Sequence, residues 1–194
     1  MRAYLIALGA ASVIILAIIL SSYGHLNPAP VTTSASTTTS TSYAVDAVSV
    51  ISSAASRAPP GYAEGQAQQL NPSEPGLEGA GYAVFSSQTG SLGNLTVLVF
   101  GGPGSAQTYI DSVVANAKGL IGYTDVSPAL SSYGHYGICY GYGEDDPDGN
   151  GSVATGVCTR GNVYIQVHLV SHSPLSIARQ DVASIIGAVY GGIG

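Results

Sequence analysis

The feature that constrains this chain most is an uncharged, apolar run near its amino terminus. Residues 3–23 contain no Asp, Glu, Lys or Arg, and as a helix they would extend about 31 Å. That length matches the hydrocarbon core of a bilayer. A cleaved signal peptide is the alternative, but its apolar region is usually shorter and ends at a small-residue cleavage site. We therefore predict an uncleaved transmembrane anchor that contacts membrane lipid through residues 3–23, with the amino terminus in the cytoplasm.

A polar segment separates this anchor from the rest of the chain. Every residue except one between positions 32 and 42 is Ser or Thr. Such a segment has no apolar side chains to bury, so it favours an extended stalk of the kind that is often O-glycosylated outside the cell. The predicted organisation is an anchor at 1–23, a stalk at 24–42 and an extracellular head at 43–194, on a protein that crosses the cell membrane once.

The apolar periodicity of the head predicts an α+β fold. The helical pattern alternates with β-rich runs, and residues 58–79 read as an irregular surface segment. The expected elements are a helix at 43–57, strands at 81–87 and 94–101, a helix at 105–118 capped by Ser105, strands at 136–143, 152–159 and 162–170, and a final helix capped by Ser173. Regular alternation of strand and helix is missing. We therefore expect an antiparallel sheet of about five strands, with two or three helices covering one face.

The two cysteines of the chain, Cys139 and Cys158, fall on two strands predicted to form a hairpin. The midpoint between them lies in the intervening loop, so the two residues are expected to face each other directly. Opposed residues of an antiparallel pair come close enough for a disulfide, and such a bond persists outside the cell. Two free buried thiols are the alternative. A disulfide here would stabilise the fold by about 3 kcal/mol in the chain-entropy relation.

The hairpin loop "GEDDPDGNGS" at 143–152 has the composition of a calcium site. Asp146, Asp148 and Asn150 match the opening of an EF-hand-like loop, where alternate oxygen ligands wrap one cation. The match fails at the twelfth position, Val157, and no helix flanks the loop, so Glu144 would have to supply a ligand from the other side. Because Asp, Asn, Gly and Pro are also ordinary turn residues, a plain hairpin turn remains an alternative.

The loop also contains a sequon for N-glycosylation. Asn150 is followed by Gly and Ser, and a second sequon begins at Asn94, which is followed by Leu and Thr. Both lie in or beside predicted hairpin loops. A glycan on Asn150 would remove its amide from any metal shell.

Tyrosines are concentrated in the stretch "SSYGHYGICYGYG" that begins at residue 131. Alternate tyrosines on a strand share one face, so Tyr136, Tyr140 and Tyr142 are candidates for a contact surface. The alternative is that they simply cover the open side of the sheet.

Composition and motifs narrow the function classes. Charged residues are 8% of the chain, the formal net charge is −6, and Lys118 is the single lysine, which argues against nucleic-acid binding. No catalytic motif is present, and no cofactor is predicted other than calcium. His135, His168 and His172 are candidate metal ligands only if they meet at one end of the sheet. We expect a binding or structural module whose partner is a membrane protein or surface protein; the alternative is an extracytoplasmic metal-dependent protein or enzyme.

Overall fold

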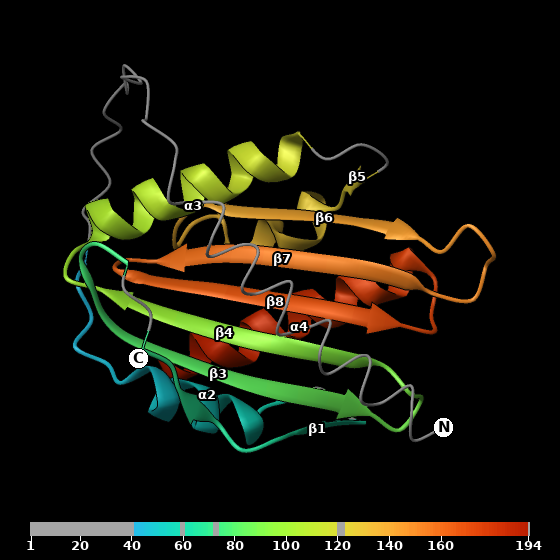
Figure 1. Cartoon of the computed structure of the whole chain (residues 1–194), viewed down its shortest axis with the longest axis horizontal. Helices are drawn as coiled ribbons and strands as arrows, with labels where there is room; N and C mark the ends of the chain where they lie inside the picture. The colour runs from blue at the N-terminus through green and yellow to red at the C-terminus, as the bar shows by residue number, and fades with distance from the viewer. Residues whose placement is uncertain (1–40, 59–60, 72–73, 120–122, 194) are drawn as a thin grey trace. The chain divides into compact units, whose positions relative to one another are not determined.

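The computed structural model describes residues 41–58, 61–71, 74–119 and 123–193, which belong to one compact unit (Figure 1). They form an eight-stranded antiparallel sheet with helices on both sides. Within these residues, no helix combines the length and apolar character needed to cross a membrane. The predicted anchor at 3–23 and nearly all of the stalk lie outside the described residues.

The order of elements agrees with the predicted α+β class. In chain order they are α2 (Ala47–Ala55), β1 (Tyr62–Glu64), β2 (Gln68–Gln69), β3 (Leu77–Ser87), β4 (Leu92–Phe100), α3 (Pro103–Lys118), β5 (Thr124–Asp125), the 3-10 helix η2 (Ser127–Tyr133), β6 (Cys139–Asp145), β7 (Ser152–Arg160), β8 (Val163–Ser171) and α4 (Leu175–Gly192). The strands follow the order β1-β3-β4-β8-β7-β6-β5, and β2 also pairs with β3.

The predicted strand number was too low. The five predicted strands correspond to β3, β4, β6, β7 and β8, whereas β1, β2 and β5 were not expected. Each of these three has only two or three residues, which is too short to show an alternating apolar pattern. They add pairing at the two edges of the sheet, so the central sheet was predicted and its edges were not.

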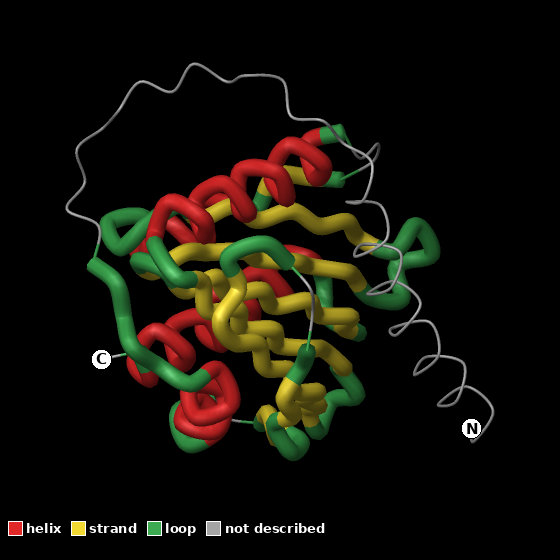
Figure 2. The backbone as a smooth tube through the Cα atoms, turned by 60° about the vertical axis from the view of Figure 1, so that its left-hand side comes forward, coloured by secondary structure: helices red, strands yellow, loops and turns green. Residues whose placement is uncertain are grey.

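Helices cover both faces of the sheet, which corrects the expectation of one covered face (Figure 2). The helices α2 and α4 pack on the face that contains Val97 and Val99, while α3 packs on the face that contains Leu98 and Phe100. The cause is that β4 is apolar on both sides in this stretch. Each fully buried side chain of this size contributes about 1.5–3 kcal/mol, so both faces favour a helical cover. We call the second face the α3 face.

Two of the predicted helix caps are wrong. The helix α3 begins at Pro103, before Ser105, and has no side-chain cap, because proline suits the first turn of a helix. At α4, Pro174 is extended and the helix begins at Leu175, so Ser173 lies outside it. The N-cap of α2 is Asp46, whose Oδ1 accepts a 2.7 Å bond from the amide of Ser49.

Candidate functional site

The disulfide predicted from the sequence is present. Cys139 on β6 pairs directly with Cys158 on β7, and their Cα atoms are 4.2 Å apart. Cys158 is completely buried, and the hydroxyl of Tyr190 lies 3.8 Å from the sulfur of Cys139. The bond joins the two strands that lead into and out of the acidic loop, and it lies against α4.

Three tyrosines gather near the β5 edge of the sheet, and we call Tyr123, Tyr140 and Tyr142 the tyrosine patch. The centroid of the Tyr142 ring lies 5.5 Å from that of Tyr123 and 6.1 Å from that of Tyr140. The Nζ atom of Lys118, at the end of α3, lies 5.6 Å from the centre of the Tyr140 ring. All three tyrosines are partly exposed. The patch therefore presents aromatic surface with one cation at its margin.

The phenols of Tyr123 and Tyr140 keep their protons at neutral pH. Burial raises the pKa of Tyr123, and the nearby Glu144 carboxylate raises it further. Burial also raises the pKa of Tyr140, with a further contribution from Asp125. A neutral phenol both donates and accepts hydrogen bonds. The patch therefore suits a partner that offers apolar surface together with polar groups.

Tyr136, which was predicted to belong to the contact surface, lies outside this patch, and the contact surface itself stays a prediction. It lies in the turn before β6, so strand alternation does not apply to it. Its ring centroid is 5.2 Å from that of Tyr190 on α4, and the guanidinium of Arg160 lies 5.1 Å from its centre. Arg160 also lies 5.2 Å from the ring of Tyr43 and donates to the backbone carbonyl of Tyr190. This cluster has a structural role, because it holds the start of the head against α4.

The acidic loop between β6 and β7 is closed by its own hydrogen bonds. The amide of Asp148 donates to Oδ1 of Asp146 over 3.0 Å, and the amide of Asp146 donates to the carbonyl of Gly151 over 2.8 Å. Asp145, the last residue of β6, accepts a 2.7 Å bond from the amide of Leu175, the first residue of α4. The loop therefore supplies a cap for α4 from a distant part of the sequence.

The calcium site stays a prediction. Asp146, Asp148 and Asn150 lie in the loop, whereas Glu144 lies within β6 beside Tyr123. In the described part of the chain, no group of three or more His, Cys, Asp or Glu side chains could hold a metal ion. Three of the four predicted ligands, Glu144, Asp146 and Asp148, are carboxylates, and they do not form such a group.

The structure does not bring the three candidate histidines together. The Nδ1 of His168 lies 2.8 Å from Oγ1 of Thr155 on the α3 face, and burial lowers the pKa of this imidazole. His172 lies next to the acidic loop. The ring of His135 packs on Tyr136, with centroids 3.7 Å apart. Each histidine therefore has different neighbours.

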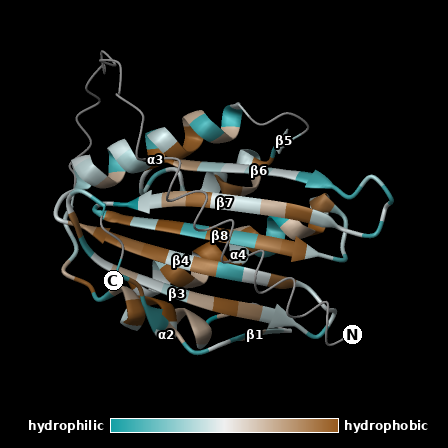
Figure 3. Ribbon diagram, viewed as in Figure 1, coloured by the Kyte–Doolittle hydropathy of each residue, from teal (hydrophilic) through white to brown (hydrophobic). Residues whose placement is uncertain are grey.

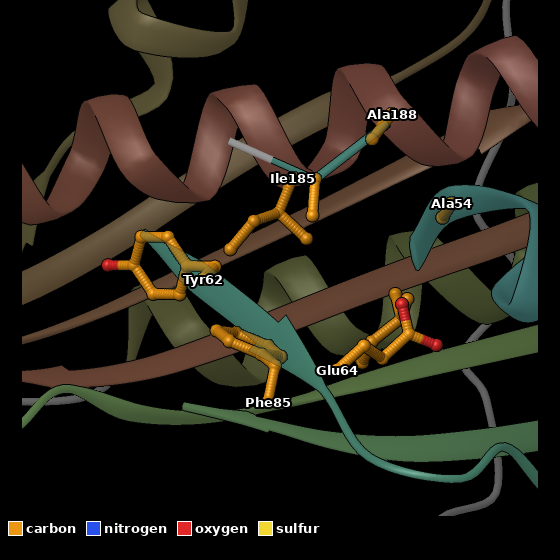
Figure 4. A pocket seen from close by; sticks show the side chains of 8 residues that line it. Ala54, Tyr62, Glu64, Phe85, Ile185 and Ala188 are labelled. Atoms are coloured by element: carbon orange, nitrogen blue, oxygen red, sulfur yellow. The ribbon is translucent and has the colours of Figure 1, made fainter. Parts of the chain in front are cut away.

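A small cavity lies between β1 and the helices α2 and α4 (Figure 4). Its volume is about 20 Å³, enough for one water molecule. Burial raises the pKa of the Glu64 carboxyl, which faces this cavity, to about 7. Its neighbour Tyr62 donates a 2.8 Å bond to Oδ2 of Asp181. The lining is Ala54, Ala58, Tyr62, Glu64, Phe85, Leu95, Ile185 and Ala188. The cavity is too small for a substrate. Because the pKa of Glu64 is raised to about 7, this residue is a candidate for making the stability of the head depend on pH.

The two sequons lie in different surroundings. Asn150 is exposed in the acidic loop, whereas Asn94 is the third residue of β4 and is partly exposed.

Asn94 lies on the part of the α3 face that α3 does not cover, which we call the open half. Figure 3 shows hydrophilic residues interrupting the apolar β4 and β8. The side chains of the open half include Tyr82, Val84, Leu92, Asn94, Thr96, Val153, Thr155, Gln166, His168 and Val170, and none of these belongs to either core cluster.

Three polar residues with clear structural roles were missed from the sequence. Asp145 caps α4, Glu64 faces a cavity, and Arg160 packs among tyrosine rings. The sequence signal for Glu64 was strand alternation at 62–64, because Tyr62 and Glu64 are separated by one residue and so share a face. A strand of three residues is too short for that signal to stand out. The other two roles depend on tertiary contacts and have no local signal.

Solved structures with a similar fold include two mycobacterial proteins. One is the extracellular domain of PknH from Mycobacterium tuberculosis, with 13% identity, a TM-score of 0.48, and coverage of 68% of this chain and 86% of that chain. The other is a putative uncharacterized protein from Mycobacterium smegmatis, with 11% identity, a TM-score of 0.42, and coverage of 76% and 99%. The chain matches no protein-family model and no curated protein. Neither structural similarity is close enough to assign a ligand or an activity.

Proposed function

We propose that this chain is a membrane-anchored extracellular binding module. Residues 3–23 would anchor it, residues 24–42 would carry the head away from the membrane, and the head would contact a membrane-protein or cell-surface partner. Three observations support the extracellular location: the uncharged run, the Ser/Thr-rich segment, and the disulfide in the head. A structural disulfide persists in oxidising compartments and is rare in the cytosol.

The tyrosine patch is the observation that carries the binding function. Tyr123 and Tyr142 lie edge to face with an interplanar angle of 70°, so each ring restricts the other. Preordered aromatic rings lose little conformational entropy on binding, and tyrosine is enriched where proteins make contact. The carboxylate of Glu144 and the amine of Lys118 flank the patch and would set the orientation of a partner.

The binding role can be tested with the full chain purified from its native membrane in mild detergent. Tyr123→Ala/Tyr142→Ala removes two rings of the patch. Tyr136→Ala is the matched control, because it removes an equally large, exposed ring on the α4 side. Loss of a central aromatic contact costs about 2 kcal/mol or more, so we expect at least a tenfold loss of the co-purifying partner for the patch variant only. Equal recovery from both variants would refute a contact through the patch.

The location can be tested separately with sealed membrane vesicles or intact cells. Protease added from outside should cut the stalk and release the head, while the anchor stays with the membrane. Release of the head only after the membrane is permeabilised would place it on the cytoplasmic side and would refute the extracellular assignment.

A further inference from the structure

The sequon at Asn94 lies at the centre of the open half. Asn94 pairs with Val84 on β3 and with His168 on β8, and the next residue, Leu95, points to the opposite face and is buried there. Because side chains alternate along a strand, Asn94 projects from the α3 face. A strand in the middle of the sheet is unusual for a glycan, but this side chain faces away from the core.

The open half exposes apolar surface around Asn94. Val84, directly opposite Asn94, is 46% exposed, and Val170, one row away on β8, is 39% exposed. They are two of only five large apolar side chains that are exposed in the described residues. Val84 on β3 and Val170 on β8 therefore flank Asn94 from the two strands beside β4.

One polar group beside Asn94 also lacks a hydrogen-bond partner within the described part of the head. The hydroxyl of Thr96 is buried and makes no hydrogen bond, the only buried side-chain oxygen or nitrogen in the described residues of which this is true. Thr96 is 7% exposed and lies on the same face as Asn94, two residues along β4. A buried polar group without a partner costs about 1–3 kcal/mol. Because this oxygen is itself buried, a group on the open half would reach it only if neighbouring side chains moved.

We propose that Asn94 carries an N-linked glycan whose first sugars lie on the open half, over Val84 and Val170. In the transfer step, Nδ2 of Asn94 forms a bond to the anomeric carbon of a glycosyl diphosphate donor, the diphosphate leaves, and Nδ2 loses one proton. A glycan fits the face because it offers hydroxyl groups as well as apolar C–H surface. The proposal rests on the proposed function, since it requires export of the head.

The timing of the transfer and its place on the sheet follow from the geometry. Thr96 is the hydroxyl residue of the sequon and is buried in the folded head, so the transfer must precede pairing of β4 with β8. The open half at β4 is three strands away from β6, about 14 Å at the usual strand spacing. On this face Asn94 and Tyr142 lie in one row, because His168 and Thr155 pair in sequence between them, so a glycan that extended from Asn94 toward β6 would reach the edge of the tyrosine patch.

The second sequon provides an internal comparison. Asn150 itself is exposed in the acidic loop, although the next two residues, Gly151 and Ser152, are buried. A glycan at Asn150 would project into solvent, whereas one at Asn94 would lie on the sheet. The two glycans should therefore differ in how readily an enzyme removes them from the folded protein.

The test uses full-length protein purified from its native membrane and begins with mass spectrometry of the peptide that contains Asn94. Asn94→Gln and Thr96→Ala should each lose one glycan mass, and Thr96→Ser, which keeps the sequon, should retain it. A peptide:N-glycan amidase should then release the Asn150 glycan, where present, at least tenfold faster than the Asn94 glycan from folded protein. After denaturation the two rates should become equal. Where Asn150 is unmodified, the Asn94 rates before and after denaturation are compared.

Two results would overturn the proposal. An unmodified Asn94 in a head that protease reaches from outside would refute the glycan and leave the proposed function standing. Rapid release from folded protein, at the rate seen after denaturation, would show that the glycan projects from the sheet instead of covering it. A head that protease cannot reach from outside would instead refute the proposed function on which the inference rests.

Discussion

Removing the disulfide should destabilise the head by an amount that the structure allows us to work out. The bond spans a sequence separation of 19, for which the chain-entropy relation gives about 3 kcal/mol at 25 °C. Cys158 is fully buried, so replacing its sulfur leaves a small void worth about 1 kcal/mol more. For Cys139→Ala/Cys158→Ala we therefore expect a loss of about 3–4 kcal/mol, a large part of the 5–15 kcal/mol typical of a domain. The variant should fold but melt early.

Urea unfolding followed by far-UV circular dichroism would measure this loss. With a slope near 2 kcal/mol/M, the midpoint should fall by about 1.5–2 M. The slope itself should rise, because the unfolded chain without its cross-link exposes more surface. A midpoint that falls by less than about 0.5 M would refute the reasoning. It would mean that the β6–β7 hairpin stays paired in the unfolded state, so that the cross-link removes little entropy.

Three further perturbations have definite expected outcomes. Asp145→Ala leaves the amide of Leu175 without its acceptor, so it should lower the free energy of unfolding measured in urea by about 1–2 kcal/mol, and Asp145→Asn should lower it by less. Equal stability of Asp145→Ala and wild type would contradict the cap. Burial raises the pKa of the Glu64 carboxyl in the folded head to about 7, from an ordinary value of 4.5. In this pH range the folded state therefore binds more protons than the unfolded state does. The contribution of Glu64 to the free energy of unfolding should accordingly fall as pH rises from about 4.5 to 7. Glu64→Gln should flatten this decline in melting temperature, while Glu78→Gln, at an exposed site, should not. If the acidic loop binds calcium, 1 mM calcium should raise the melting temperature of wild type but not of Asp148→Ala; no rise in wild type would remove the calcium prediction.

The parts of the fold that the sequence predicted are those with long or paired signals. The apolar run from Leu95 to Phe100 identified a central strand, and the apolar stripe of 105–118 identified the helix α3. The disulfide was predicted because Cys139 and Cys158 are symmetric about a turn-forming loop, which fixes the hairpin register. In each case the information lies within one segment or one hairpin.

What could not be predicted depends on contacts between distant segments. The cap of α4 comes from Asp145, 30 residues before Leu175, and a local reading could only choose among neighbours such as Ser173. Tyr136 was grouped with the patch because it is close in sequence, but the turn before β6 directs it toward α4 instead. The edge strands β1, β2 and β5 form because the ends of the sheet offer unpaired backbone groups, and their own residues carry little strand signal.

The sequence contains the residue pattern that limits the open half, but this pattern can be recognised only when the pairing register of the strands is known. On the α3 face, β4 presents Phe100, Leu98, Thr96 and Asn94 in turn, and its partner β8 presents Tyr164, Gln166 and His168. Both strands change from apolar to polar at the same row, where Thr96 pairs with Gln166. A helix gains little from covering polar rows, so α3 packs on the apolar rows and ends its contact there. The same change in pattern that limits α3 leaves the sequon at Asn94 on an uncovered surface, which is why a candidate glycan site can occur in the middle of a sheet.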